Sequence, residues 1–471
     1  MFFRQIEDKG LSQFSYFIAC EIDKIALVVD PKRDVDTYMD LAAQHGYKIK
    51  YILETHIHAD FASGANELAN LSGAELMLSS YDTGEKYEYT LKHTELVDQQ
   101  EILLGKSVKV KVLHTPGHTP EHLSFILFDA VDSFEQPKIF LSGDFLFMGS
   151  VGRPDLLGEV EKLALAKKLY HSINTKLQGL HDNVLVYPGH GAGSLCGANL
   201  TKGSHSTMGT EREVNVYLKE KMTEDEFLSR IFASTPPFPE YYLLMKETNA
   251  KGQALLGGIP SITSLDAAQF ENDALSDGVV LDLRHPLSFG GAHIPDALNI
   301  NMGDELSFWA AWVVPYDMPI YLVVEHEIDL EHAIRSLMRV DLDNIGGYLK
   351  SGFNAWVASG ADFRDIPQAS VLFLDDMMDA GEKLTVLDVR TDSEWKEGHI
   401  KGARHIYLGE LKDKLDKLPG NDETIFCICG GGHRSSIAAS ILQAAGFEMV
   451  YNVYGGMNSW KAAGLSTVST N

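Results

Sequence analysis

The sequence predicts an α/β protein of about three domains: one with two layers of sheet and outer helices, then two small, doubly wound α/β domains. Three observations support this fold class. The chain has 471 residues, whereas single domains usually hold about 100–200. In the first half, short apolar strands alternate with amphipathic helices. In the second half, a stretch of about 100 residues occurs twice.

Composition and charge restrict the class of protein. Hydrophobic residues make up 45% and charged residues 23% of the chain, which is typical of a globular protein. Lys and Arg total 40 and Asp and Glu total 66, so the formal net charge is −26. Because this charge repels phosphate backbones and anionic lipid surfaces, we expect neither nucleic-acid nor membrane binding.

The cysteines and the N-terminal sequence indicate a cytoplasmic protein. The cysteines, Cys20, Cys196, Cys427 and Cys429, are too few and too unevenly spaced for a disulfide framework. The acidic pair at residues 7–8 interrupts the apolar segment that a signal peptide needs. No apolar run reaches the roughly 18–20 residues of a membrane span.

The first predicted domain, residues 1–251, has polar residues where its strands end. Strands are predicted at residues 14–22, 25–30, 47–56, 107–115, 123–128, 138–147 and 183–190, with a helix from Val35 to Gln44. Several of these strands run directly into His or Asp. Two sheet layers with helices outside would bring these strand ends together along one edge.

Six metal-ligating side chains follow these strands. They are His56, His58, Asp60, His118, Asp144 and His190. The first three alternate in THIHADF, so that in extended geometry they project to one side. Imidazole and carboxylate groups together suit a divalent metal. The set therefore predicts a metal site at this edge of the sheets.

This order of motifs resembles the metallo-β-lactamase superfamily, whose pattern is T-H-x-H-x-D-H, then a His after TPG, an Asp after SGD and a late His. The resemblance implies an αββα sandwich for residues 1–245. One position departs from it, because Phe61 stands where dinuclear zinc hydrolases have a His that binds the second metal. An aromatic ring donates no lone pair, so the second site keeps only Asp60, His190 and a share of Asp144. Hydrolysis through two zinc ions is therefore disfavoured.

The remaining pattern resembles the persulfide dioxygenase branch, in which two histidines and one carboxylate hold a single Fe(II). The resemblance implies His56, His118 and Asp144 as the ligands of one Fe(II) per chain, with Zn(II) as the metal that could replace it on isolation. Such a triad leaves open positions for a thiolate-type substrate and O2. The other three side chains of the set would then orient the ligands or bind metal themselves.

Two further residues lie near the position where this branch binds its substrate. Arg153 would suit an anionic thiol carrier, although a structural ion pair explains it equally well. Cys196 follows a glycine-rich turn, where it could carry sulfur transiently or be inert. Cys20 lies in an apolar strand and is interpreted as a core residue.

The second half contains an internal repeat whose offset is 385 minus 279, or 106 residues. VVLDLRHP at 279–286 recurs as TVLDVRTD at 385–392, and AHIPDALNI at 292–300 recurs as GHIKGARHI at 398–406. Short strands alternate with helices in both copies. We therefore predict two homologous domains, residues 260–365 and 368–471.

A reactive cysteine follows a strand of the second copy. The sequence CGGGHR, Cys429 to Arg434, leads into a helix for which Ser435 or Ser436 is available as cap. Such a loop points backbone N–H groups inward at a helix N-terminus, where they and Arg434 would stabilise a thiolate. The glycines at 430–432 let the backbone curl without Cβ clashes. The pattern predicts a nucleophilic cysteine.

The second copy resembles the rhodanese family. Its motifs are Asp388 and Arg390, the segment GHIKGA and the loop that begins at Cys429. The resemblance implies that Cys429 carries a sulfane sulfur as a persulfide and passes it to an acceptor nucleophile. Cys427, two positions earlier, is interpreted as a core residue.

The first copy shares sequence motifs with the second but has no cysteine. Asp282 and Arg284 match the second copy, whereas counting places Val324 opposite Cys429, and no cysteine occurs between residues 197 and 426. Without a sulfur nucleophile this copy cannot carry a sulfane sulfur. It resembles an inactive rhodanese module, which would be a spacer or a surface that positions the active domains or a second subunit.

The fused order resembles bacterial persulfide dioxygenase–rhodanese proteins, and this resemblance implies sulfide detoxification. A thiol persulfide and O2 would give sulfite, which the Cys429 persulfide would convert to thiosulfate. The alternatives are a mononuclear zinc thioester hydrolase of the glyoxalase II type and a sulfur-trafficking scaffold without turnover. The sequence leaves the carrier thiol open among glutathione, coenzyme A, bacillithiol and cysteine, and it leaves a homo-oligomer open.

Overall fold

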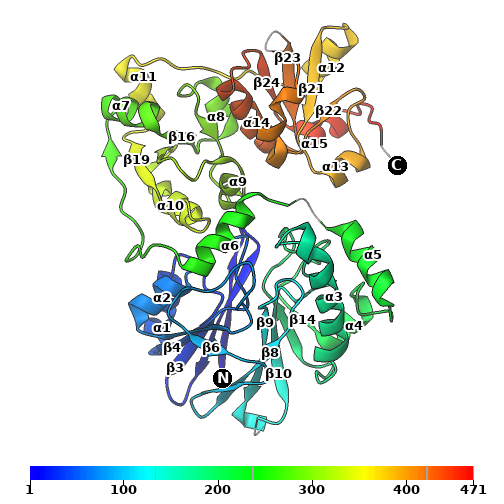
Figure 1. The fold of residues 1–471 in the computed structure, drawn as a ribbon. Helices are drawn as coiled ribbons and strands as arrows, with labels where there is room; N and C mark the ends of the chain where they lie inside the picture. The colour runs from blue at the N-terminus through cyan, green and yellow to red at the C-terminus, as the bar shows by residue number, and fades with distance from the viewer. Residues whose placement is uncertain (133, 236–237, 421–422, 470–471) are drawn as a thin grey trace. The chain divides into compact units, whose positions relative to one another are not determined.

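The computed structural model describes residues 1–132, 134–235, 238–420 and 423–469. It divides into two compact units (Figure 1). The first unit comprises Met1–Pro260 with Met338–Asp341, and the second comprises Ser261–Leu337 with Leu342–Asn471. The predicted α/β fold class is confirmed in both.

The first unit begins with a six-stranded sheet of order β1-β2-β3-β4-β5-β6. Its strands are β1 (Phe2–Asp8), β2 (Gln13–Cys20), β3 (Ile25–Val29), β4 (Lys48–Leu53), β5 (Glu75–Ser79) and β6 (Thr94–Leu96). Pairing is antiparallel from β1 to β3 and parallel from β3 to β6, and helices α1 (Asp36–His45) and α2 (Ala65–Ser72) provide the crossovers from β3 to β4 and from β4 to β5. These helices pack on the outer face.

A second six-stranded sheet has the order β14-β13-β10-β9-β8-β7. Its strands are β7 (Glu101–Leu104), β8 (Val108–His114), β9 (Leu123–Asp129), β10 (Pro137–Gly143), β13 (Leu185–Pro188) and β14 (Ser206–Thr207). A small hairpin of β11 (Leu146–Phe147) and β12 (Ser150–Val151) follows β10. Helices α3 (Glu159–Lys176), α4 (Met208–Val214) and α5 (Glu224–Ser234) follow along the chain, and side chains of all three pack in one core with the outer face of this sheet.

The two sheets share one apolar core. Alternate residues of β2, such as Tyr16 and Ile18, pack with Val110 of β8 and Phe125 of β9. The period of two places these side chains on the inner faces, while the intervening residues face the helices. The predicted αββα sandwich is confirmed. Helix α6 (Tyr241–Lys251) ends the sandwich and lies next to the loop after β4, where it reaches the functional site.

The second unit contains two parallel five-stranded sheets with equivalent topology. The first has the order β15-β19-β18-β16-β17 and the second has the order β20-β24-β23-β21-β22. The strands are β15 (Ser264–Leu265), β16 (Val279–Asp282), β17 (Leu298–Asn299), β18 (Ile320–Val323) and β19 (Ile345–Leu349), then β20 (Gln368–Ala369), β21 (Leu384–Asp388), β22 (Arg404–His405), β23 (Thr424–Ile428) and β24 (Val450–Val453). The repeat found in the sequence is therefore also a repeat of fold.

Helices cover both sheets of this unit. The first copy has α7 (Ala267–Asp277), α8 (Pro286–Gly291), α9 (Leu306–Val313), α10 (Leu330–Met338) and α11 (Phe353–Ser359). The second copy has α12 (Val371–Asp379), α13 (Asp392–Glu397), α14 (His433–Ala444) and α15 (Gly456–Ala462). Buried apolar side chains such as Leu374, Phe426 and Trp460 join helices to sheet in the second copy.

The same buried ion pair fixes both copies. In the first, Arg284 Nη2 donates to Asp282 Oδ2 at 2.6 Å and to the carbonyl of Ala292 at 2.9 Å. In the second, Arg390 Nη2 donates to Asp388 Oδ2 at 2.6 Å and to the Gly398 carbonyl. A buried charge needs a partner, so each copy must keep both residues of its pair to hold the end of this strand in place.

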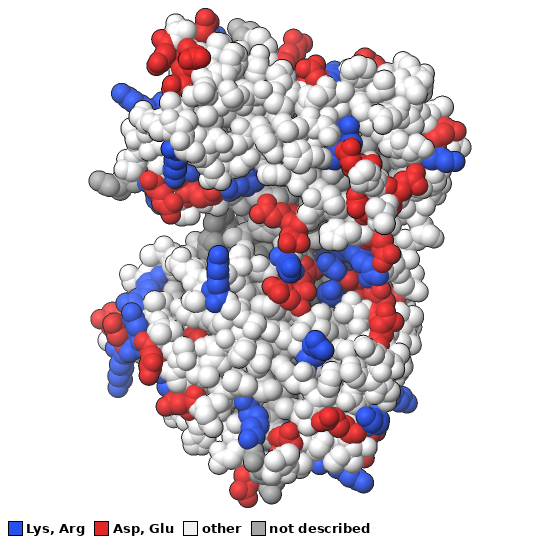
Figure 2. Space-filling view, turned by 180° about the vertical axis from the view of Figure 1, so that it is seen from behind, with Lys and Arg blue, Asp and Glu red and all other residues white. Residues whose placement is uncertain are grey.

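The surface agrees with the acidic composition. Figure 2 shows one face on which Lys and Arg side chains lie scattered among Asp and Glu. Among the described residues, no helix is both long and apolar enough to cross a membrane.

Candidate metal centre and sulfur-transfer loop

Three predicted ligands converge where strands of both sheets end. His56 follows β4, His118 lies between β8 and β9, and Asp144 follows β10, and all three side chains are buried. Their ligating atoms lie within 4.8 Å of one another. Asp144 Oδ2 is 3.4 Å from His118 Nε2 and 3.9 Å from His56 Nε2. The arrangement is a two-histidine, one-carboxylate cluster.

The atoms of this cluster fit a metal ion. His56 Nε2, His118 Nε2 and Asp144 Oδ2 are all buried without a hydrogen-bond partner. Buried polar atoms are nearly always paired, so three orphaned lone pairs that face one point call for a cation. The donor set suits Fe(II) and Zn(II) alike.

Hydrogen bonds hold both histidines in the ligating tautomer. His118 Nδ1–H donates to the main-chain oxygen of Arg153 at 2.8 Å. Thr55 Oγ1 donates to Asp30 Oδ2, so it accepts from Nδ1–H of His56, 2.9 Å away. In both rings the lone pair is left on Nε2.

Burial favours the neutral form of the two candidate ligand histidines. Burial lowers the pKa of His56 well below its usual value, and the neighbouring His58 lowers it further. Burial likewise lowers the pKa of His118, with His122 as the next cause. Because only neutral imidazole binds a metal, the site needs no deprotonation of these rings at neutral pH.

His58 lies beside this cluster and bonds elsewhere. Its Nε2 is 3.1 Å from Asp30 Oδ1, which also accepts from the backbone N–H of Thr55 at 2.7 Å. Although burial opposes its charge, Asp30 raises the pKa of His58. Its ring centroid lies 4.4 Å from that of Phe61. Asp30 thus positions the loop that carries the ligands, a role that the sequence analysis missed.

A second group of ligating atoms lies alongside. Asp60, His190 and Cys196 are buried, and their ligand atoms lie within 4.8 Å of one another. From the sequence alone, this site keeps only Asp60, His190 and a share of Asp144. The structure adds the Cys196 thiol, whose pKa is raised by burial and by Asp60. Phe61 supplies no ligand atom, as the sequence indicated.

His190 links the two groups. Its Nδ1 is 2.8 Å from Asp144 Oδ1 and its Nε2 is 2.6 Å from Asp60 Oδ2. Burial disfavours a charged ring, but the two carboxylates raise the pKa of His190 well above its usual value. The ring therefore orients Asp144, whose other oxygen faces the first cluster.

Cys196 reaches the site through a long-range backbone contact. Gly152 and Gly197 form an isolated antiparallel bridge, and the N–H of Arg153 donates to the Cys196 carbonyl at 2.9 Å. A Cβ on Gly152 would lie 2.0 Å from the Asp144 carbonyl oxygen, so only glycine fits. Cys196 is 1% exposed, so its thiol lies inside the protein although a glycine-rich turn precedes it.

The Arg153 side chain is engaged in an ion pair. Its Nε and Nη2 donate to the two carboxylate oxygens of Asp155 at 2.7 and 2.9 Å, and Nη1 donates to the Leu195 carbonyl. From the sequence, Arg153 could form a structural ion pair or contact the substrate. The structure shows the ion pair with Asp155. Lys246 of α6 is a further buried cation, which donates to the Ile57 carbonyl at 2.7 Å.

The second chemical site is the loop after β23. Cys429 is 1% exposed, and its Sγ accepts from the Gly432 N–H at 3.1 Å and lies 3.3 Å from Ser435 Oγ, whose hydroxyl donates to Asn452 Oδ1 at 2.7 Å. Helix α14 begins at His433 with Gly432 as its N-cap, so the predicted cap at Ser435 or Ser436 is wrong. Those serines lie inside the helix because the glycine adopts φ +106°, which starts the helix earlier.

The carbonyl groups of the loop are held by helix α15. The N–H of Met457 donates to the Cys429 carbonyl at 2.7 Å, and the N–H of Asn458 donates to that of Gly430 at 3.0 Å. The Gly455 N–H binds the carbonyl of Gly431. With the carbonyls engaged there, the loop can present N–H groups to an anion on Cys429.

Arg434, which the sequence predicts to stabilise a thiolate at Cys429, is paired with a carboxylate. Its two terminal nitrogens donate to the carboxylate of Glu394, each at 2.7 Å. Although burial raises the pKa of Glu394, Arg434 lowers it to about 2. The guanidinium charge is therefore shared with a carboxylate, and the contacts to Cys429 come from Gly432 and Ser435.

The other two cysteines lie within strands. Cys20 in β2 and Cys427 in β23 are fully buried, as expected of core residues. Burial raises the pKa of the Cys427 thiol, which opposes thiolate formation.

Comparisons with known proteins agree with both halves of this picture. The family model described as metallo-beta-lactamase superfamily matches residues 8–190, and the model of the rhodanese-like domain matches residues 370–463. A solved metallo-beta-lactamase from Staphylococcus aureus subsp. aureus COL is 33% identical, with a TM-score of 0.66, over 74% of this chain and 99% of that one.

Curated relatives match one half at a time. The putative sulfur carrier protein YrkF of Bacillus subtilis is 39% identical over 22% of this chain and 55% of its own length. Hydroxyacylglutathione hydrolase GloC of Haemophilus influenzae is 28% identical, over 42% and 90%. The mitochondrial persulfide dioxygenase ETHE1 of Bos taurus is also 28% identical, over 40% and 67%. The chain belongs to the metallo-beta-lactamase superfamily and carries a rhodanese-like domain after that fold.

Proposed function

We propose that the first unit is a non-haem iron persulfide dioxygenase and that the second copy of the repeat is a sulfurtransferase that uses its product. The observation that carries this proposal is the buried cluster of His56, His118 and Asp144, on the same chain as the Cys429 loop. A single Fe(II) held there would supply the oxygen chemistry, with open positions for a thiolate and O2. The persulfide dioxygenase relative supports this assignment.

The residues around the cluster would fix the orientation of its three side chains and keep bulk solvent away from them. The Arg153 carbonyl fixes the His118 ring, and His190 holds one oxygen of Asp144 so that the other faces the cluster. All these groups are buried, which excludes bulk water from the ligands. A small persulfide would be oxidised here by O2, and attack of one water molecule would release sulfite and the free thiol.

Cys429 would convert that sulfite to thiosulfate. Its thiolate attacks the terminal sulfur of a second persulfide, and the carrier leaves as a thiolate. Sulfite then attacks the outer sulfur of the Cys429 persulfide, which releases thiosulfate and restores the Cys429 thiolate. The N–H of Gly432 stabilises the negative sulfur in both steps.

The second candidate is a zinc thioester hydrolase of the glyoxalase II type. The hydroxyacylglutathione hydrolase matches at the same identity as the persulfide dioxygenase. The group of Asp60, His190 and Cys196 also favours it, since it offers ligands for a second ion. In that case the rhodanese-like domain would serve a separate sulfur transfer.

Oxygen consumption separates the candidates. Protein loaded anaerobically with iron is mixed with glutathione persulfide and then with coenzyme A persulfide, and zinc-loaded protein is the control. Uptake with iron and not with zinc supports the dioxygenase. Thioester cleavage by the zinc form, without uptake by the iron form, would assign the hydrolase instead.

The remaining assignments follow from this proposal. The functional domains are residues 1–251, 260–365 and 368–471, the first copy of the repeat is an inactive rhodanese module, and the protein works in the cytoplasm. The substrates are a low-molecular-weight thiol persulfide, O2 and sulfite.

A further inference from the structure

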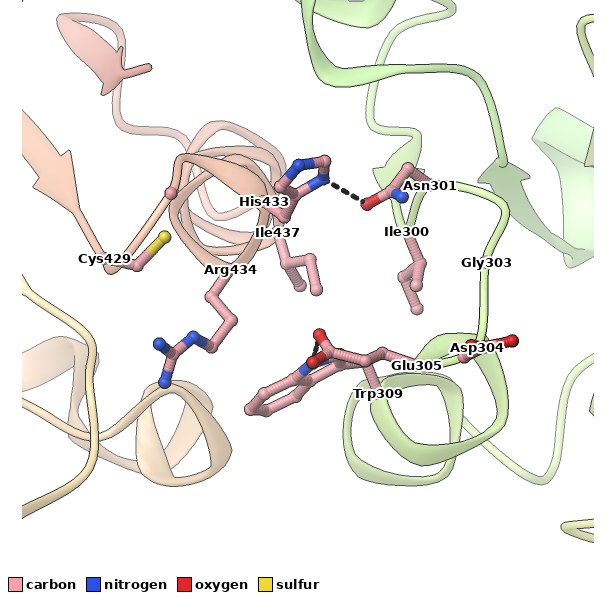
Figure 3. Close-up of a pocket in the computed structure, with 11 residues that line it drawn as sticks. Ile300, Asn301, Gly303, Asp304, Glu305, Trp309, Cys429, His433, Arg434 and Ile437 are labelled. Carbon is pink, nitrogen blue, oxygen red and sulfur yellow. Dashed lines mark hydrogen bonds between the residues drawn. The ribbon is translucent and has the colours of Figure 1, made fainter. Parts of the chain in front are cut away.

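A cavity lies over Cys429 and has walls from both copies of the repeat. Its volume is about 330 Å³. The second copy contributes Cys429, His433 and Arg434, and the first copy contributes Glu305 and Trp309 (Figure 3). The copy that lacks a thiol therefore forms part of the chamber in which the other copy's thiol reacts.

Hydrogen bonds fix the two walls relative to each other. Asn301 Nδ2 donates to the Met302 carbonyl, so its Oδ1 faces His433 and accepts from Nδ1–H at 2.9 Å. Ser436 Oγ donates to Asn299 Oδ1 at 2.6 Å, and both residues are buried. Helix α14, which carries the loop, is thus anchored to the first copy along its length, and the wall is a constant part of the site.

This wall adds two acidic residues, Asp304 and Glu305, and Glu305 is the one whose side chain extends along the cavity. Its carboxylate accepts from the indole N–H of Trp309 at 3.2 Å. Among the described residues no basic group lies within ion-pair distance of it, whereas Arg434 is already held by Glu394. Figure 3 shows the Glu305 side chain extending along the Trp309 ring toward the side of Cys429 and Arg434, while Asp304 points away.

We propose that Glu305 is a specificity residue that recognises an ammonium group on the thiol carrier whose persulfide loads Cys429. The Glu305 carboxylate is exposed at the wall of this chamber, where it attracts a cation and repels an anion, although solvent and salt weaken both effects. The favoured class is the persulfides of small aminothiols, and thiols that carry a carboxylate or phosphate near the sulfur are disfavoured. This inference rests on the proposed role of Cys429.

The loading step shows why the charge matters. The Cys429 thiolate attacks the terminal sulfur of R–S–S–H, the S–S bond of the donor breaks, and R–S⁻ leaves with the electron pair. The products are Cys429–S–S–H and R–S⁻, so atoms and charge balance without an external oxidant. An ammonium group on R, held by Glu305, keeps the donor in place while its leaving sulfur becomes negative.

The test compares two donors of the same size and opposite charge. Cysteamine persulfide and 3-mercaptopropionate persulfide are mixed with the full chain, and loading of Cys429 is followed by mass spectrometry of the peptide. We expect cysteamine persulfide to load faster by at least about threefold, an effect of the size of one partly exposed ion pair. Added salt should reduce this ratio.

Variants of Glu305 and of the neighbouring Asp304 identify the residue responsible for the charge preference. Glu305→Gln should bring the ratio close to one and Glu305→Lys should invert it. Asp304→Asn is the matched control, because it removes one neighbouring negative charge that points away, and it should keep the preference. An unchanged ratio in both Glu305 variants, with native tryptophan fluorescence, overturns the inference.

A chemical probe separates this inference from the proposed function. Cationic and anionic methanethiosulfonate reagents transfer an alkylthio group to Cys429 with methanesulfinate as the leaving group, so they test access to the thiol without transfer of a sulfane sulfur. If the reagents react but neither persulfide loads Cys429, the proposed function fails, and the carrier assignment fails with it. If both persulfides load at equal rates, only the specificity fails.

Discussion

The ring of His118 is fixed by the backbone of Arg153, whose carbonyl oxygen accepts from Nδ1–H at 2.8 Å. This bond joins the turn after β8 to the segment after β12 and leaves the Nε2 lone pair on the side of Asp144. The ligand geometry therefore depends on main-chain atoms, which a substitution of the Arg153 side chain leaves in place.

Replacing a ligand should abolish metal binding. His118→Ala removes one of three donors, so we expect iron affinity to fall by more than about 100-fold, since changes to hydrogen-bond partners of ligands alone cost 10–100-fold. Metal content by mass spectrometry measures it. His114→Ala is the control, because that histidine bonds the Pro120 carbonyl and stacks on Tyr81. Equal metal content in the two variants would refute the ligand assignment.

Removing the loop thiol should uncouple the two chemistries. Cys429→Ser leaves the metal ligands untouched, so oxygen uptake on a persulfide should persist at the wild-type rate. Sulfite should accumulate in place of thiosulfate, because a serine hydroxyl cannot hold a sulfane sulfur. Chromatography of the sulfur oxyanions tests this. Undiminished thiosulfate in the variant would show that Cys429 is not the carrier.

The loop should also depend on a glycine in α15. A Cβ at Gly456 would lie 2.3 Å from the Cys429 carbonyl oxygen and 2.7 Å from that of Gly430. Gly456→Ala should push the loop out of place and lower sulfur transfer by at least about tenfold, since misplacement of about 1 Å can cost 100-fold. Gly464→Ala has a similar positive φ but open space around its Cβ, and it should transfer sulfur normally.

The pair of Arg434 and Glu394 should stabilise the second unit in a pH-dependent way. The folded pKa of Glu394 is about 2, below its usual 4.5. The stabilisation is therefore full above about pH 4.5 and is lost as pH falls toward 2. Because the two side chains are 20% and 33% exposed, we expect it to be about 1–2 kcal/mol.

Glu394→Gln tests this linkage. All five tryptophans lie between residues 309 and 460, so tryptophan fluorescence in urea reports on the second unit alone. The free energy of unfolding of the variant should be lower than that of wild type at pH 7, and the difference should shrink as pH falls below 4.5. A difference that grows on acidification would contradict the sign of the pKa shift.

Much of the site could be predicted because it follows local rules. The alternation of His56 and His58 after an apolar strand, and a reactive cysteine before a glycine-rich helix start, are short-range patterns. The two copies of the repeat could be aligned by counting, and the structure gives them the same sheet order. The N-cap of α14 was misplaced by three or four residues because serines favour caps, whereas here a glycine with positive φ begins the helix.

The parts that sequence did not predict depend on long-range pairing. Cys196 joins Asp60 only because Gly152 bridges Gly197, and Asp30 meets His58 through the packing of neighbouring parallel strands. No local pattern encodes either contact. The partner of Arg434 was missed for the same reason, since Glu394 precedes it by 40 residues.

The cavity over Cys429 combines a nucleophile and a wall that lie in different copies of one ancestral segment. A substitution at Glu305 would change the wall of this cavity, while the glycine loop of the other copy keeps its own sequence. Under the proposed function, the copy without a thiol is therefore a region in which substrate preference can change separately from the reactive loop.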